Sequence, residues 1–83
     1  MGMTKPLYSQ KNIALIATLR SARESLGLTQ LQLSERINRS QSYVAKYENN
    51  ERSLKLIEFI EICEALNISP SEVIKEITND YNI

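Results

Sequence analysis

The sequence predicts an all-α fold, a compact domain of five helices without strands. Two observations predict it. The 83-residue chain has only two Gly and two Pro, and it is rich in Leu, Ile, Glu, Gln, Lys and Arg, which favour helix. Its apolar residues recur at the spacing that places them on one face of a helix. Hydrophobic residues make up 42% of the chain, so we expect one small core built from Leu and Ile.

Residues 1–10 are predicted to form a flexible arm, and residues 11–83 the folded domain. The arm is largely polar, and Lys5-Pro6 disfavours helix. A helical pattern begins at Asn12 and ends at Gly27, which supplies a left-handed stop. One stripe of this first helix consists of Ile16, Leu19, Ala22, Arg23 and Leu26.

The second predicted helix, Thr29 to Ile37, opens with a complete start signal. Thr29 and Gln32 have the spacing of a capping box, in which each side chain bonds the other residue's backbone. Leu28 and Leu33 have the spacing of the hydrophobic staple that accompanies such a box. Together the two signals fix where this helix begins.

The third predicted helix runs from Gln41 to Glu48, with Val44 and Tyr47 facing inward. Ser40 is a favourable N-cap. Asn49-Asn50 ends the helix, because Asn tolerates the left-handed conformation. Only residues 38–40 separate this helix from the second, too few for antiparallel packing. The pair therefore predicts the steep crossing of a helix-turn-helix.

The fourth and fifth predicted helices cover residues 54–66 and 70–79. A proline at the first position of the fifth helix, a Ser69–Glu72 capping box and an Ile68–Val73 staple define its start. The inward residues of the fourth helix are expected to be Leu56, Phe59, Ile60, Cys63 and Leu66.

From about Ile16 to Val73 the sequence resembles helix-turn-helix transcriptional regulators of the Cro/phage-repressor type. The resemblance implies a lambda-repressor-like fold with its motif at about residues 29–49. It also implies sequence-specific binding to double-stranded DNA without a cofactor. The matching residues are Leu19-Arg20-x-x-Arg23, Gly27-Leu28-Thr29-Gln30-x-x-Leu33-Ser34, Ser40-Gln41-Ser42-Tyr43-Val44, Tyr47-Glu48-Asn49 and Ala65-Leu66-Asn67-Ile68-Ser69.

The resemblance assigns roles to individual residues. The exposed first turn of the third helix would enter the major groove and read bases, with Lys46 further along the same face. The base-reading residues are then Ser40, Gln41, Ser42 and Lys46, and those that contact the DNA backbone are Gln30, Arg39, Tyr43, Asn49 and Arg52. Arg23 and Glu48 would form a structural ion pair, and Asn38 and Asn50 stand where the family has glycines.

From the sequence alone, these residues could also have structural or solvent-exposed roles without contacting DNA. Gln30 and Gln41 are also ordinary solvated residues at helix starts, and the Tyr43 ring could pack on a neighbouring helix. Arg52 and Lys55 could be plain surface charge.

The net charge is zero, but it is unevenly distributed along the chain. Residues 1–55 hold nine Lys and Arg against four Glu, and residues 56–83 hold one Lys against six acids. We interpret this as a basic half that faces DNA and an acidic half turned away.

Two copies of the chain are expected on a two-fold operator, because one small domain binds DNA weakly. The surplus apolar residues Ile74, Tyr81 and Ile83 in the last helix and tail, residues 70–83, are the candidate dimer surface. Antitoxin, with a toxin protein as partner, and restriction–modification controller are alternative roles. RNA polymerase is a further candidate partner, and an interaction module that does not bind DNA is a weaker alternative.

An enzyme or a membrane protein is not expected. The chain has no His and one Cys, so neither a catalytic site nor a metal site is predicted, and Cys63 is interpreted as a buried core residue. No apolar run approaches the roughly 20 residues that a membrane helix needs, and no signal sequence is recognisable. A cytoplasmic protein is expected.

Overall fold

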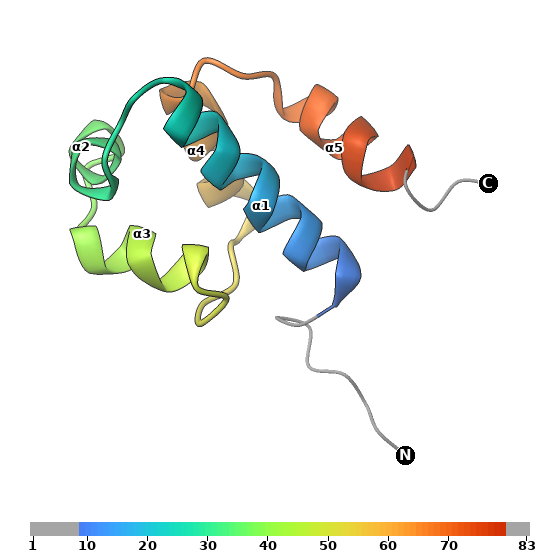
Figure 1. Cartoon of the computed structure of the whole chain (residues 1–83), viewed down its shortest axis with the longest axis horizontal. Coiled ribbons are helices and arrows are strands. Elements are labelled where there is room, and N and C mark those ends of the chain that lie inside the picture. The colour runs from blue at the N-terminus through green and yellow to red at the C-terminus, as the bar shows by residue number, and fades with distance from the viewer. Residues whose placement is uncertain (1–8, 80–83) are drawn as a thin grey trace.

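The computed structural model describes residues 9–79, and within them the chain forms five helices and no strand. This confirms the predicted all-α fold (Figure 1). The helices, in chain order, are α1 (Gln10–Ser25), α2 (Gln30–Arg36), α3 (Gln41–Glu48), α4 (Leu56–Ala65) and α5 (Pro70–Asn79).

Helix α1 begins two residues earlier than the sequence predicted. The side chain of Ser9 is the N-cap, and its hydroxyl accepts a hydrogen bond from the backbone N–H of Asn12 at 3.1 Å. Gln10 therefore belongs to the helix and not to the predicted arm, of which residues 1–8 lie outside the described residues.

The cap signals at Thr29 and Ser40 form as expected, and at Ser69 the backbone N–H of Glu72 donates to Ser69 Oγ at 3.4 Å. The backbone N–H of Gln32 donates to Thr29 Oγ1 at 3.0 Å, and the N–H of Thr29 donates to Gln32 Oε1 at 2.8 Å, which completes the capping box of α2. Ser40 Oγ accepts from the backbone N–H of Tyr43 at the start of α3. Each cap satisfies backbone donors that the first helical turn leaves unpaired, so the helices begin where the sequence places these residues.

Left-handed residues end the first four helices. Gly27 has φ 71°, and Asn38 and Asn50 have φ 58° and 60°, as the sequence predicted for these positions. Asn67 does the same at the end of α4 with φ 58°, which the sequence analysis did not single out. These residues turn the chain sharply, and the turn at Asn38 sets α2 and α3 at the angle that exposes one face of α3.

The core is apolar and draws on every helix. Its buried residues are Ile16, Leu19, Leu33, Val44, Tyr47, Phe59, Ile62, Cys63, Leu66 and Val73. Two residues that were predicted to face the core do not: Leu56 is 66% exposed and Leu26 is 45% exposed. Leu56 is the first residue of α4 and Leu26 the C-cap of α1, so both lie where a helix leaves the core. Ile62, which was not predicted, occupies the core face of α4 instead.

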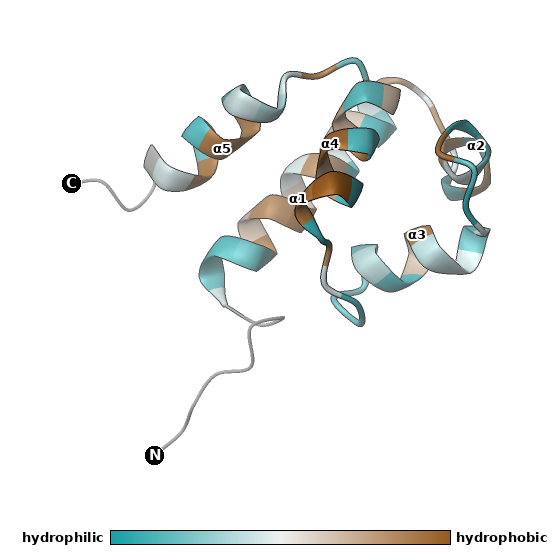
Figure 2. Cartoon of the chain, turned by 180° about the vertical axis from the view of Figure 1, so that it is seen from behind, coloured by the Kyte–Doolittle hydropathy of each residue, from teal (hydrophilic) through white to brown (hydrophobic). Residues whose placement is uncertain are grey.

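Helix α1 contacts both α3 and α5, and α4 contacts α5. Figure 2 shows hydrophobic residues concentrated on α1, α4 and α5, whereas α3 carries mainly hydrophilic residues. Within residues 9–79 no helix is long and apolar enough to cross a membrane.

Candidate nucleic-acid interface

Helix α3 lies at the edge of the molecule and presents one polar face to solvent (Figure 1). Its other face is anchored by Val44 and Tyr47, whose side chains are fully buried. The residues predicted to read bases are all exposed on the free face: Ser40, Gln41, Ser42 and Lys46. The first turn therefore offers hydroxyl and amide groups, which can both donate and accept hydrogen bonds.

A buried ion pair holds the far end of α3. Glu48 Oε2 accepts from Arg23 Nε at 2.7 Å, and Glu48 Oε1 accepts from Arg23 Nη2 at 3.0 Å. The Glu48 side chain is fully buried, and Arg23 also donates to the carbonyl of Leu28 at 2.6 Å. The hydrogen bond to Glu48 raises the pKa of the Arg23 guanidinium above its usual value. The structure thus joins α1, the following turn and α3 through the two residues that the resemblance paired.

Gln30 belongs to the same network. Its side-chain Nε2 donates to Glu48 Oε1 at 2.9 Å, so the first residue of α2 is fixed to the last residue of α3. One hydrogen on Nε2 and the amide oxygen remain available to another partner. The position of Gln30 therefore allows it both to brace α3 and to contact a phosphate.

Arg39, Tyr43 and Arg52 form a second cluster beside α3. The guanidinium carbons of Arg39 and Arg52 lie 4.9 and 4.8 Å from the centre of the Tyr43 ring. The ring in turn meets Tyr47 edge-on, with centroids 5.8 Å apart. Cation–π contacts of this length are favourable, and they place both arginines next to the first turn of α3.

Glu58 of α4 is the shared anchor of this cluster. Its Oε2 accepts from Arg52 Nη2 at 2.7 Å and from Arg39 Nη1 at 3.5 Å, and its Oε1 accepts from the backbone N–H of Lys55 at 2.9 Å. The Lys55 N–H, followed by the two guanidinium groups, lowers the pKa of the Glu58 carboxyl. Glu58 was not predicted from the sequence, because Lys55 has no side-chain acceptor and so the pair lacks the residue types of a capping box.

Comparison with known proteins agrees with this geometry. The sequence profile of the helix-turn-helix family matches residues 19–73. The chain belongs to the Cro/C1-type helix-turn-helix family. It is therefore a DNA-binding transcriptional regulator and not an enzyme.

Solved structures of other proteins have the same fold. An XRE-family-like protein from Pseudomonas syringae is 36% identical, with a TM-score of 0.80 over 83% of this chain and 84% of that one. The clp gene regulator ClgR from Corynebacterium glutamicum is 28% identical, with a TM-score of 0.75 over 87% of this chain and 94% of that one.

A third structure shares the fold at lower identity. It is the restriction–modification controller C.Esp1396I, a tetramer in complex with its natural 35 base-pair operator. It is 21% identical, with a TM-score of 0.76 over 86% of this chain and 93% of that one. A search of curated proteins finds no match to the sequence.

The charges of this helix-turn-helix protein are less separated in space than along the chain. Glu58 belongs to the acidic half, yet it contacts Arg39 and Arg52 of the basic half. Arg23 is neutralised by Glu48, and Arg36 donates to the carbonyl of Ala65 in α4. The prediction of an acidic half turned away from the basic half is therefore wrong for Glu58 and Glu61, which contact arginines of the basic half.

The structure places the remaining polar candidates as follows. Asn49 is the C-cap of α3 and is exposed. Cys63 is fully buried, and burial raises the pKa of its thiol to about 11, so at neutral pH it is an unreactive core residue. Within residues 9–79 no group of His, Cys, Asp or Glu could hold a metal ion.

An apolar surface lies on α4 and α5, away from the polar face of α3. Ile74 is 47% exposed, and it borders a shallow groove with residues of three other segments. Leu56 and Ile57, at 66% and 64% exposure, add to the apolar surface at the start of α4 and were missed by the sequence analysis. Tyr81 and Ile83, the other predicted dimer residues, lie outside the described residues. The groove residues are Leu15, Leu54, Leu56, Phe59, Ile74 and Ile77.

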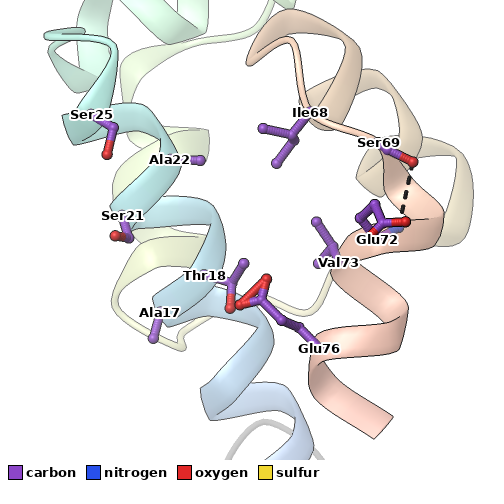
Figure 3. Close-up of a pocket in the computed structure, with 10 residues that line it drawn as sticks. All are labelled: Ala17, Thr18, Ser21, Ala22, Ser25, Ile68, Ser69, Glu72, Val73 and Glu76. Atoms are coloured by element: carbon purple, nitrogen blue, oxygen red, sulfur yellow. Dashed lines mark hydrogen bonds between the residues drawn. The ribbon is translucent and has the colours of Figure 1, made fainter. Parts of the chain in front are cut away.

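A second groove separates α1 from α5. Thr18 and Ala22 of α1 point across it toward Glu76 and Ile68 (Figure 3). It lies on the side of α1 away from α3 and takes no part in the interface.

Proposed function

We propose that this regulator reads a specific DNA sequence by inserting α3 into the major groove. The observation that carries the proposal is the polar first turn of α3, exposed at the molecular edge and held from behind by the buried Arg23–Glu48 pair. A helix of this diameter fits the major groove, where every base pair presents a distinct pattern of donors and acceptors.

Ser40, Gln41 and Ser42 are the proposed base-reading residues, together with Lys46. The Gln41 amide can pair with an adenine edge through two hydrogen bonds, and Lys46 suits a guanine or a phosphate. Their exposure on one face of α3 supports this assignment, because a buried or self-bonded side chain could not reach a base.

The proposed backbone contacts surround this face. Gln30 lies at the start of α2, where backbone N–H groups favour an anion. Arg39 precedes α3, Asn49 and Arg52 follow it, and Tyr43 lies on its first turn. Contacts of this type set the register and affinity of the protein on DNA, and they make binding strongly dependent on salt.

We further propose that two copies bind a two-fold operator through the apolar surface of α4 and α5. Ile74, with Leu56 and Ile57, exposes apolar area that a second copy would cover, and Tyr81 and Ile83 follow directly after α5. Their symmetric pairing would set the half-sites about 34–36 Å apart. Cytoplasmic location remains part of this proposal, since DNA is the partner.

The experiment that tests the proposal is selection of bound duplexes from a random DNA pool. We expect an enriched site with two-fold symmetry, and a steep fall of affinity with salt on unselected DNA. Enrichment without symmetry would refute the dimer, and a flat salt dependence would refute major-groove binding altogether.

Control of a restriction–modification system is a second candidate role. The operator-bound controller has the same fold as this chain over most of its length, which supports the idea. A methyltransferase gene beside the gene for this chain would favour it, whereas a neighbouring toxin gene would favour the antitoxin alternative.

A further inference from the structure

The two arginines that flank α3 are already fixed in the protein without DNA. Arg39 comes from the turn before α3 and Arg52 from the loop after it, yet both reach the same carboxylate oxygen of Glu58. Both guanidinium groups also stack on the Tyr43 ring. Long side chains on two separate loops are thus held together beside the first turn of the proposed recognition helix.

Glu58 is suited to this because it is itself immobilised. Only 8% of its side chain is exposed, and the Lys55 N–H occupies its other oxygen at 2.9 Å. Glu58 is also part of the first turn of α4, and the residue after it, Phe59, is in the core. The carboxylate is therefore a rigid anchor for the two flexible arginines.

The anchor leaves the arginines able to bind a phosphate. The side chains of Arg39 and Arg52 are 38% and 39% exposed. A guanidinium has five N–H donors, and Glu58 takes one nitrogen of each. Donors remain on both groups, and their direction is fixed by the carboxylate and the ring.

We propose that Glu58 is a positioning residue for DNA binding, which pre-orients Arg39 and Arg52 as a paired clamp for the phosphates beside the recognition helix. This rests on the proposed function of α3. The advantage is entropic: side chains already held in place lose less freedom when DNA binds. The cost is that a negative charge lies close to the phosphates.

These two effects of Glu58 have opposite signs, which makes the proposal testable. If Glu58 acted only through its charge, its removal would strengthen DNA binding. If it positions the arginines, Glu58→Gln weakens binding even though a negative charge is lost. Glutamine keeps the length of the side chain and an oxygen for the Lys55 N–H.

Glu61 supplies the matched control. It lies one turn further along α4, 48% exposed, with an oxygen 3.7 Å from Arg39 Nη2. Glu61→Gln removes the same charge near the same arginine without touching the anchor. We expect Glu61→Gln to bind a random-sequence 20 base-pair duplex slightly more tightly than wild type, and Glu58→Gln to bind it roughly tenfold more weakly.

The measurement is fluorescence anisotropy of that duplex at several salt concentrations, repeated in an Arg52→Gln background. In that background the effect of Glu58→Gln on DNA affinity should be a small fraction of its size in the wild-type chain. The reason is that Arg52, the arginine that Glu58 binds more closely, is absent. Tighter or unchanged binding by Glu58→Gln, or an undiminished effect without Arg52, would overturn the proposal. Failure of the wild-type protein to bind the duplex would instead refute the proposed function.

A measurement on the wild-type protein covers the case in which Glu58→Gln does not fold. Side-chain ¹⁵N relaxation of the Arg39 and Arg52 Nε–H groups reports their order in the absence of DNA. We expect both to be as ordered as the helix backbone. Order parameters below about 0.6, the range of flexible groups, would overturn the proposal without any variant.

Discussion

The carboxylate of Glu48 receives two hydrogen bonds from the guanidinium of Arg23, at 2.7 and 3.0 Å, and thereby ties the last residue of α3 to α1. The same carboxylate receives the side chain of Gln30, so one buried anion organises three helices. Removing one partner of such a pair strongly destabilises the fold, because the other partner is left as a buried, uncompensated charge.

Glu48→Ala should therefore destabilise the domain by about 3–5 kcal/mol, which for a domain of this size means unfolding or loosening at moderate temperature. Thermal and urea denaturation followed by circular dichroism measure this. Lys75→Ala is the control, because the Lys75–Glu72 pair is more than two thirds exposed and should matter little. Wild-type stability in Glu48→Ala would contradict a structural role for the pair.

Unlike the Glu48 carboxylate, the hydroxyl of Tyr47 is buried without a hydrogen-bond partner among the described residues. An unsatisfied buried hydroxyl costs free energy of folding, so Tyr47→Phe should leave stability unchanged or raise it by up to about 1–2 kcal/mol. The same denaturation experiments test this. A loss of more than about 1 kcal/mol would show that the hydroxyl has a partner after all.

Alkaline pH should destabilise the fold through Cys63. Burial raises the pKa of its thiol from 9.0 to about 11, so the unfolded chain releases this proton before the folded one does. Stability is therefore fully present below pH 9 and falls as the pH rises toward 11, by about 2 kcal/mol for this group.

Urea denaturation between pH 8 and pH 11 should show this fall, and Cys63→Ala should reduce it. Tyr47, whose pKa is also raised by burial, adds to the loss at the upper end of the range. A comparison made in a Tyr47→Phe background separates the two groups. An identical pH dependence with and without the thiol would rule out Cys63 as a source.

Local signals explain what could be predicted from the sequence. The first residues of α3 and α5 follow from Ser40 and Ser69, because an N-cap acts on the next three residues and needs no tertiary information. The all-α fold and most of the core follow from periodicity in the same way. The DNA-contacting residues proposed for α3 were predicted only through the family resemblance, since exposed polar residues have no periodic signal.

The predictions that failed concern relations between distant segments. Glu58 meets Arg39 across 19 residues, and no local pattern indicates which acid a loop arginine will find. Periodicity also misplaced Leu56, because it shows the face of a helix but not where neighbouring elements stop covering it. For the same reason, the charge pattern along the chain did not indicate that Glu58 and Glu61 contact arginines of the basic half.

Gln41→Ala should weaken binding to a selected operator by about 1–3 kcal/mol and relax the sequence preference at one position of each half-site. Binding to random DNA should change little, because phosphate contacts dominate there. Competition titrations on operator variants measure both effects. Equal losses on operator and random DNA would mean that Gln41 contacts the backbone and does not read a base.

The apolar surface of α4 and α5 gives the last prediction, which concerns assembly. Ile74→Ser, or removal of residues 78–83, should weaken dimerisation at least tenfold, because exposed apolar area is the main source of affinity between two copies. Sedimentation velocity over a concentration series measures the shift toward monomer. Ile13→Ser is the matched control, since Ile13 is as exposed as Ile74, at 47%, but does not line the α4–α5 groove. If Ile74→Ser and the truncated chain sediment like wild type, the dimer forms through another surface. If Ile13→Ser alone dissociates the dimer, that other surface includes Ile13.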